Sequence, residues 1–319
     1  MDRTLRDPSL VRPILLGMAG AVVLAALGSA LPDYWTQLLT RILIMALFAT
    51  SLNLQVGYSG MLPLGHSMFL GLGAYSFGLL LTKGSLSLPE AFLLSLALCA
   101  VSAIIIGYLC LRGSPMTFGL LHLGFNILLA TLIDKWISLT GGDAGIMGIA
   151  RPHHFTGALG FFYFVLAVVG ACFLLLRILM DSPFAKVAGG LRENEERLRF
   201  LGINIRRFQL AIFVVSGFLA AIAGMLLAML DRGVFPAYIT LTRSAEGLMM
   251  CLIGGMYSFL GPSLGAAIVV IIGTVTSTYV NQWQGLLGII IIACVIGFQG
   301  GILRKKRGRP QPSREGSAT

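Results

Sequence analysis

Long apolar segments separated by short polar connections run along almost the whole chain. A helix that crosses a membrane needs about 20 mostly apolar residues. Eight segments meet this requirement: 12–31, 38–57, 62–82, 90–111, 116–137, 159–180, 208–230 and 284–303. A further stretch, 245–280, is too long for one span, and Gly261-Pro262 divides it into 245–259 and 262–280. The pattern predicts an all-α polytopic membrane protein with about ten transmembrane segments, within a range of eight to ten.

A single domain accounts for most of the chain. We expect residues 1–303 to form one transmembrane domain and residues 304–319 to form a basic, disordered tail. The first apolar segment follows three arginines and ends at Gly28-Ser29-Ala30, as a secretory signal peptide would. Its apolar run is long for a signal peptide, so we expect an uncleaved first span.

Composition and charge support a membrane location and an orientation. The 319 residues are 56% hydrophobic and 11% charged, which excludes an ordinary soluble domain. The net charge of +10 does not indicate nucleic-acid binding, because most basic residues lie in the tails and in connections on one side of the predicted topology. Positive charge marks the cytoplasmic side, so both termini are predicted to be cytoplasmic. The basic residues on the other side are Arg41, Lys83, Lys135, Arg151, Arg232 and Arg243.

The charged segment 181–207 interrupts the apolar pattern and predicts an amphipathic helical hairpin in water. Ser182 is a suitable N-cap, and Pro183 suits a first helical turn. Gly189-Gly190 is expected to divide the segment into a short helix and a longer one, which Gly202 ends. One helical face carries Phe184, Val187, Leu191, Leu198 and Leu201. Such a face favours docking of a partner protein; the alternatives are a solvated connection and a helix on the lipid surface.

The apolar segments contain few groups that could drive transport or catalysis. His66 and His122 are the ionisable candidates well inside predicted spans, and a lone histidine is more often structural than a proton relay. The five cysteines lack metal-ligand spacing, so no metal or cofactor is predicted. No lysine is followed by Ser or Thr, which excludes a phosphate-binding P-loop. If ATP drives transport, a partner must hydrolyse it. Other charged residues lie near predicted span ends: Asp134, Lys135, Arg177, Asp231 and Glu246.

Residues 53–75, NLQVGYSGMLPLGHSMFLGLGAY, combine small and polar residues across two predicted spans. Gly60 and Pro63 predict a break in the helix. A broken helix is tolerated in a membrane where protein or a water-filled cavity satisfies the freed backbone groups. The segment favours a position on a translocation path, although tight helix packing would use the same glycines. The expected path residues are Asn53, Tyr58, Gly60, Gly65, His66, Tyr75 and Asn126.

Four motifs carry a family resemblance. They are the segment 53–75, the run Thr140-Gly141-Gly142-Asp143-Ala144-Gly145, the segment SPFAKVAGGLRENEERLRFLGIN, and Ile253-Gly254-Gly255 with Gly261-Pro262 and Gly265-Ala266. Together they resemble the M-type permease subunit of branched-chain amino-acid ABC importers, from about residue 40 to residue 300. The chain departs from the family pattern at Pro63, where Ser is usual, at Lys186, where Arg is usual, and at Met256 and Tyr257.

The resemblance implies the ABC importer permease fold and a set of partners. These are two ATP-binding subunits, a second related permease, an extracytoplasmic substrate-binding protein and membrane lipid, in the plasma or inner membrane of a bacterium or archaeon. It implies neither covalent chemistry nor a cofactor. Segment 181–207 would be the cytoplasmic coupling loop, contacting the ATPase through Phe184, Val187, Leu191, Arg192, Glu193, Asn194, Leu198 and Gly202.

The loop 139–158 is the longest connection on the external side, and it is too small for a receptor domain. Its glycines allow tight turns, and Asp143 is a lone acid there. In an importer this loop would face the binding protein, whereas a solvated connector is the alternative. The residues expected to matter are Thr140, Gly141, Gly142 and Asp143.

Two other functions remain open from the sequence. The chain could be a stand-alone channel or secondary carrier for a small polar solute, or a membrane scaffold without transport. The missing P-loop, the docking segment and the four motifs favour the importer subunit. Similar permeases serve leucine-type amino acids, other amino acids, amides and urea, and the sequence does not choose among them.

Overall fold

The computed structural model describes residues 31–279 except 85, 150, 152–154 and 156, together with residues 20, 24–26, 28, 29 and 285. The predicted span 284–303 and the tail 304–319 lie almost wholly outside the described residues, as does most of the predicted span 12–31.

Helices make up nearly all of the described chain. The longer ones are α2 (Asp33–Asn53), α3 (Ser67–Thr82), α4 (Leu88–Cys110), α5 (Pro115–Lys135), α7 (Ala158–Asp181), α10 (Ile205–Asp231), α11 (Leu241–Gly254) and α12 (Gly261–Tyr279). The shorter elements are the π-helix η1 (Leu54–Tyr58), the helices α6 (Ile137–Thr140), α8 (Pro183–Glu193) and α9 (Glu195–Phe200), the 3₁₀ turns η2 (Gly142–Ala144) and η4 (Pro236–Tyr238), and the strands β1 (Ile146–Met147) and β2 (Gly233–Val234).

The all-α prediction is confirmed, and each predicted span within the described residues falls on a helix. Five helical stretches in the described chain are long and apolar enough to cross a membrane: Asp33–Tyr58, Leu88–Cys110, Pro115–Lys135, Ala158–Asp181 and Ile205–Asp231. α3 and α12 are shorter apolar helices. The predicted division of 245–280 is also confirmed, because α11 ends at Gly254 and α12 begins at Gly261. The full number of crossings and the side of each terminus stay predictions.

Capping residues in the sequence fix where several helices begin. Ser87 and Glu90 form a capping box at the start of α4. The Ser114 hydroxyl accepts a hydrogen bond from the Thr117 N–H at the start of α5, where Pro115 occupies the first turn. Asn204 and Thr240 cap α10 and α11 in the same way.

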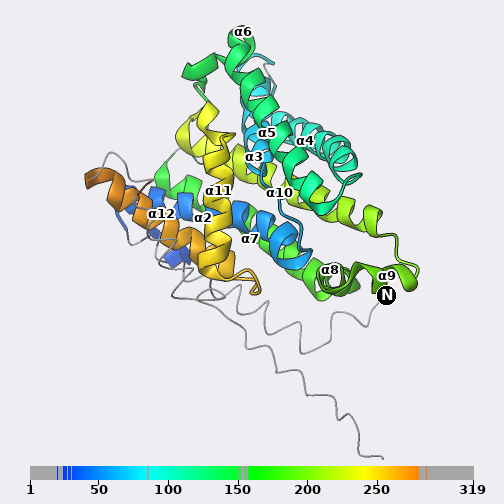
Figure 1. Ribbon diagram of the computed structural model, residues 1–319. Coiled ribbons are helices and arrows are strands. Elements are labelled where there is room, and N and C mark those ends of the chain that lie inside the picture. Colours follow the sequence, from blue (N-terminus) through cyan, green and yellow to red (C-terminus); the bar gives the residue numbers. More distant parts are fainter. Residues whose placement is uncertain are drawn as a thin grey trace, which may run out of the picture.

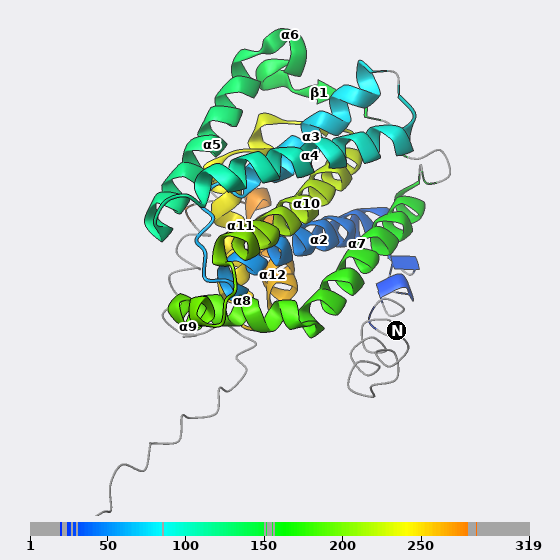
Figure 2. The ribbon, with the colours of Figure 1, turned by 90° about the vertical axis from the view of Figure 1, so that its right-hand side faces the viewer.

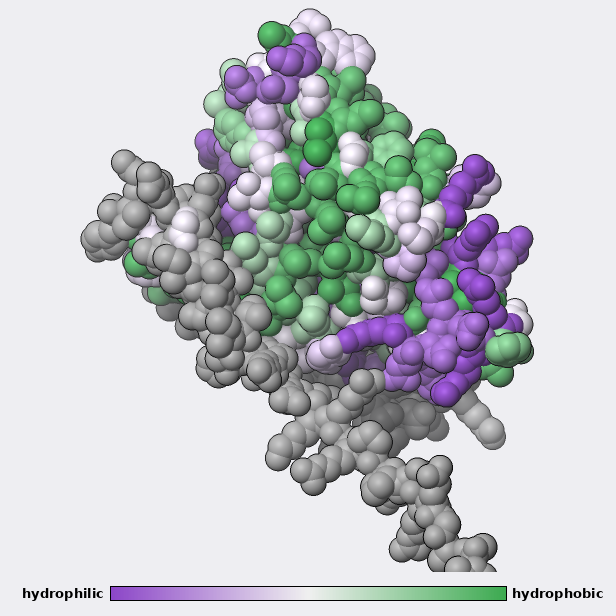
Figure 3. All heavy atoms as spheres, viewed as in Figure 1, coloured by the Kyte–Doolittle hydropathy of each residue, from purple (hydrophilic) through white to green (hydrophobic). Residues whose placement is uncertain are grey.

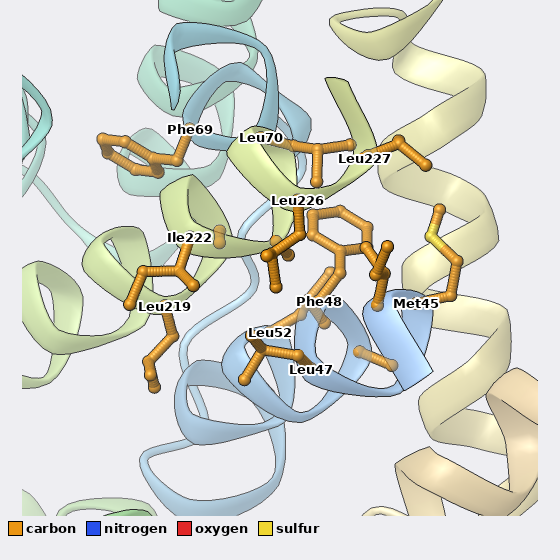
Figure 4. Packing of buried hydrophobic residues seen from close by; sticks show 14 of the residues in the cluster. Met45, Leu47, Phe48, Leu52, Phe69, Leu70, Leu219, Ile222, Leu226 and Leu227 are labelled. Carbon is orange, nitrogen blue, oxygen red and sulfur yellow. The ribbon is translucent and has the colours of Figure 1, made fainter. Parts of the chain in front are cut away.

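α2 and α10 form the centre of the molecule (Figures 1 and 2). α10 packs against α2, α3 and α4, and α2 also packs against α7, α11 and α12. In the most apolar stretch of each helix, the buried share is 72% in Asp33–Tyr58 and in α10, but only 28% in α4 and in α5 and 33% in α7. Phe48 of α2, Leu70 of α3 and Leu226 of α10 belong to one buried cluster (Figure 4).

Glycines bring the central backbones into direct contact. A Cβ added at Gly224 of α10 would lie 1.9 Å from the Leu70 carbonyl oxygen of α3, and one at Gly73 would lie 2.3 Å from the Ala221 carbonyl oxygen. These distances are far below van der Waals contact, so only glycine allows α3 and α10 to pack this closely. Close approach of small residues is a main source of helix association in lipid.

The outer helices present apolar side chains outwards. Figure 3 shows a hydrophobic belt across the molecule, with hydrophilic surface near α6 at one end and near α8 and α9 at the other. The exposed side chains include Leu93, Leu98, Val101 and Ile105 of α4, Leu120, Ile127 and Leu128 of α5, and Leu174, Leu175 and Ile178 of α7. A contiguous apolar belt of this kind matches the lipid-facing surface of a multi-pass membrane protein.

Replacing Gly224 with alanine should separate α3 from α10. We expect the Gly224→Ala protein to lose about 1–3 kcal/mol of stability through overpacking, seen as a lower unfolding temperature in detergent. Gly170→Ala in α7 is the matched control, because a Cβ there meets nothing within 4 Å. Equal unfolding temperatures for the two variants would contradict this account of the α3–α10 contact.

Candidate functional site

The predicted break before α3 is confirmed. α2 passes into the π-helix η1, and residues 59–66 form no regular helix before α3 begins at Ser67. Gly60 adopts a left-handed φ of 74°, which a side chain would disfavour. π-helical turns are rare and often mark functional positions.

A first polar network surrounds the break on the side of α2 and α10. The His66 Nε2 atom lies 3.0 Å from the Ser51 hydroxyl. Ser216 of α10 donates to the Ser51 carbonyl at 2.5 Å and accepts from the Gln55 side chain at 3.0 Å. These bonds tie η1 to α10 at a depth where lipid offers no partner for a polar group.

A second polar network joins α3, α5 and α11. The Ser67 hydroxyl accepts from Asn126 Nδ2 at 2.9 Å and from the Ser244 hydroxyl at 2.7 Å, and it donates to the Thr240 carbonyl at 2.9 Å. Asn126 Nδ2 also donates to the Gly65 carbonyl at 3.3 Å. The network links three helices through one small hydroxyl.

The structure brings together only part of the predicted path set. Gly65, His66 and Asn126 lie side by side, and a Cβ on Gly65 would meet the His122 carbonyl at 2.2 Å. Asn53 is buried in the core beside Gly57.

The remaining path residues lie apart from that cluster. Tyr58 and Gly60 lie at the end of η1 near α8, whereas Tyr75 is buried about two and a half helical turns along α3. His66 and Asn126 are buried in the first cluster and Tyr75 is buried further along α3, so all three lie in regions closed to solvent.

The predicted helix boundaries of segment 181–207 are confirmed at its two ends and wrong in its centre. Ser182 caps α8 by accepting from the Phe184 N–H at 3.2 Å, and Gly202 follows α9 with φ 76°. Gly189-Gly190 does not break the segment: α8 continues to Glu193, and the break falls at Asn194, which caps α9. Gly190 instead allows close packing, because its Cβ would lie 3.1 Å from the Leu198 side chain.

Much of the predicted apolar face holds the hairpin to its own chain. Leu191 and Leu198 are buried, Val187 is half-buried, and the Phe184 ring lies 4.6 Å from the Phe208 ring of α10. By contrast, Phe200 and Leu201 are 89% and 70% exposed at the end of α9. These two exposed side chains form the outward apolar surface of the hairpin. The helical pattern in the sequence did not identify them as a pair.

Arg192 connects the hairpin to the helix break. Its Nη1 donates to the Gly57 carbonyl of η1 at 2.8 Å, and its Nη2 bonds the Tyr257 hydroxyl between α11 and α12. The guanidinium lies 4.1 Å from the Tyr257 ring centroid, within cation–π range. A Cβ on Gly60 would lie 3.2 Å from Arg192 Cγ, so this one side chain contacts both η1 and the start of the break.

The loop 139–158 lies at the end of the molecule opposite α8 and α9 (Figure 1). As its glycines predicted, Gly141, Gly142, Gly145 and Gly148 all have positive φ. Thr140 donates to the Ile133 carbonyl at 2.5 Å and fixes the start of the turn, and β1 pairs antiparallel with β2 through Ile146 and Val234. Asp143 lies in η2 and is exposed.

A cavity of about 440 Å³ lies between α2, α10, α11, α12 and η4. Its charged and polar lining includes Arg41, Asp231, Tyr238, Arg243 and Glu246. Burial and the nearby Asp231 carboxylate raise the pKa of Tyr238, so its hydroxyl stays protonated and donates to Asp231 at 2.6 Å.

The lining of this cavity includes none of the seven residues predicted for the path. One sequence signal could have pointed to this cavity, because Asp231 and Glu246 are ionisable groups near the ends of apolar segments.

The apolar belt and the helices long enough to cross a membrane define a multi-pass helical membrane protein. The chain belongs to the family described as the permease component of branched-chain amino acid transport systems, whose model matches residues 34–296. It is therefore a multi-pass permease subunit of an ABC transporter, a class that is normally not catalytic.

Named relatives agree on the class and differ in cargo. The chain is 27% identical to the high-affinity branched-chain amino acid transport system permease protein LivM of Salmonella typhimurium, over 94% of this chain and 77% of that protein. It is 28% identical to LivM of Escherichia coli strain K12, over 84% and 69%. It is 27% identical to the autoinducer 2 import system permease protein LsrC of Salmonella paratyphi B, over 72% and 68%. No solved structure matches the chain.

Removal of the Ser67 hydroxyl should weaken the contact of α3 with α5 and α11. In Ser67→Ala the Ser244 hydroxyl loses its acceptor and Asn126 keeps only its longer bond, so we expect a loss of about 1–3 kcal/mol. Ser102→Ala is the control, since Ser102 is only partly buried and its hydroxyl bonds within its own helix. Thermal unfolding in detergent measures both, and an equal melting temperature would exclude a role for this network in stability.

Proposed function

We propose that this chain is one of two membrane-spanning subunits of an ATP-driven importer for branched-chain or related amino acids. The observation that carries the proposal is the family match over residues 34–296. The choice of substrate follows the LivM relatives of Salmonella typhimurium and Escherichia coli, which align over more of this chain than LsrC does. The membrane would be the plasma or inner membrane of a bacterium or archaeon.

The proposed assembly contains the second related permease, two ATP-binding subunits and an extracytoplasmic substrate-binding protein. The need for separate ATP-binding subunits is supported by the sequence, in which no lysine precedes Ser or Thr as a P-loop requires. The α8–α9 hairpin supports a docking role, because it carries charged residues and lies at one end of the apolar belt (Figure 3).

Within the hairpin, the contact with the ATPase is proposed to centre on Phe200 and Leu201. Exposed apolar side chains on a water-facing surface favour a protein interface. Leu191 and Leu198 would act indirectly, since they are buried against the rest of the chain and hold the hairpin in place. Arg192, Glu193 and Asn194 lie at the junction of α8 and α9, where they set the angle between the two helices.

The translocation path is proposed to run beside η1 and α3. Within the described chain, both polar atoms of the Asn53 side chain and both ring nitrogens of His122 are buried without a hydrogen-bond partner. A buried polar atom without a partner costs about 1–3 kcal/mol. A conformation in which this region opens to water would recover that energy, and this supports a sealed path that opens during transport.

A double substitution on the hairpin tests the proposed function and the docking surface. The tagged chain, produced with the other subunits, should retain the ATPase through detergent purification and support ATP-dependent leucine uptake in proteoliposomes. Phe200→Ser with Leu201→Ser should remove most of the bound ATPase, because the exposed apolar contact is lost while the core is untouched.

The matched control is Met147→Ser with Leu241→Ser, two exposed apolar residues outside the hairpin. It should retain the ATPase fully. If the native chain takes up solute without any ATPase, the stand-alone carrier is correct. If the Phe200/Leu201 variant keeps its ATPase, the docking surface lies elsewhere on the chain.

Asp143 is proposed to meet the binding protein, on the side from which an importer is loaded. Asp143→Ala should weaken the stimulation of ATP hydrolysis by the loaded binding protein, while basal hydrolysis stays normal. Asp33→Ala, which removes another exposed acid, should leave stimulation unchanged. If the loaded binding protein still stimulates ATP hydrolysis fully in Asp143→Ala, Asp143 does not contact it and the loop only connects two helices.

A further inference from the structure

The cavity between α2, α10, α11, α12 and η4 combines a polar part with an apolar wall. Its volume of about 440 Å³ lies within the range of pockets that hold small molecules, about 300–1,000 Å³. Two basic and two acidic side chains line it, so the formal charge of the lining sums to zero. Leu38, Met45, Leu227 and Val269 form part of the apolar wall.

The charged groups are paired with one another, but the two arginines still have N–H donors that the ion pairs do not use. Arg41 Nη2 lies 2.5 Å from Asp231 Oδ1, and Arg243 Nη1 lies 2.7 Å from Glu246 Oε2. A guanidinium has five N–H donors, and each of these ion pairs uses one nitrogen. Arg243 Nε is buried without a hydrogen-bond partner among the described residues.

The two ion pairs in the cavity favour a zwitterionic ligand over a simple cation or anion. A simple cation or anion would leave one arginine or one carboxylate uncompensated, which is unfavourable in a partly buried site. A zwitterion brings both charges on neighbouring atoms, and it can exchange partners with the two ion pairs without changing the net charge. The apolar wall then accommodates an aliphatic side chain.

We propose that this cavity is a transient binding site for a zwitterionic amino acid with an aliphatic side chain. Arg41 and Arg243 face the ligand carboxylate, and Asp231 and Glu246 face its ammonium group. The substrate class rests on the proposed function; the site itself rests on the cavity and its charges.

The position of the cavity suits an early step of import. Asp231 ends α10, whose first residue, Ile205, follows the α8–α9 hairpin. A 27-residue helix is about 40 Å long, so Asp231 lies near the end opposite the hairpin. Because the ligand must displace existing ion pairs, binding is weak, and a transport site needs weak binding so that the ligand can leave.

Protection of a cysteine in the cavity provides the test. Thr274→Cys is placed in a chain lacking the five native cysteines, in complex with the other subunits, and its rate of modification by a small charged thiol reagent is measured. Leucine should slow the modification. Leucinamide, which lacks the carboxylate, and 4-methylpentanoate, which lacks the ammonium group, should each need about tenfold higher concentration.

Side-chain variants separate the cavity from the rest of the chain. Arg243→Gln and Glu246→Gln should each raise the half-protecting leucine concentration about tenfold, since each removes one charge-assisted bond. Arg232→Gln is the matched control: Arg232 is exposed, adjoins Asp231 and does not line the cavity. It should leave protection unchanged.

Saturation-transfer NMR with leucine on the native complex repeats the comparison without any cysteine substitution. Three results would each contradict the cavity proposal. They are the absence of both protection and saturation transfer, equal potency of the three ligands, and protection that survives in both glutamine variants. If the native complex imports leucine and yet shows none of these effects, the cavity proposal fails while the proposed function stands. If the chain neither binds an ATPase nor supports uptake while leucine protects Thr274→Cys, the proposed function fails and the cavity proposal stands.

Discussion

Backbone contact between α3 and α10 is the constraint on which the rest of the structure depends. In water, burial of apolar surface would drive these helices together, but lipid tails are as apolar as leucine and remove that driving force. What remains is van der Waals packing, which is strongest where backbones touch, and Gly73 and Gly224 provide that contact. α10 then serves as the support against which α2 and α4 are placed.

Buried polar side chains in this molecule form hydrogen bonds where a helix is interrupted. The break after η1 frees backbone groups that a continuous helix would satisfy, and the serines Ser51, Ser67 and Ser216 lie next to it with their hydroxyls bonded across helices. Asp231 ends α10, Arg243 lies in the first turn of α11, and Arg41, in the third turn of α2, pairs with Asp231. The interior is thus nearly free of charge, as a membrane interior requires.

Sequence patterns predicted the helices well because length and hydropathy decide them almost alone. The same reasoning placed the breaks at Gly60 and Gly261-Pro262, where backbone chemistry is local. It misplaced the break of the coupling hairpin, because Gly190 is used for close packing against Leu198 and Asn194 supplies the actual cap. It missed the cavity, because the lining combines α2 with the later elements α10, η4, α11 and α12, and no local pattern could bring Arg41 next to Asp231, 190 residues away in the sequence.

The single bond from Arg192 to the Gly57 carbonyl makes the π-helix sensitive to small displacements. A hydrogen bond of 2.8 Å is lost once its atoms separate beyond about 3.5 Å, so a shift of α8 by about 1 Å away from η1 suffices to break it. The freed carbonyl then needs a new partner, and the non-helical residues 59–66 follow η1 directly. Rewinding of that stretch into regular helix would change the length of α2 at its end. A small displacement at the surface would thereby be converted into a change of helix length in the interior.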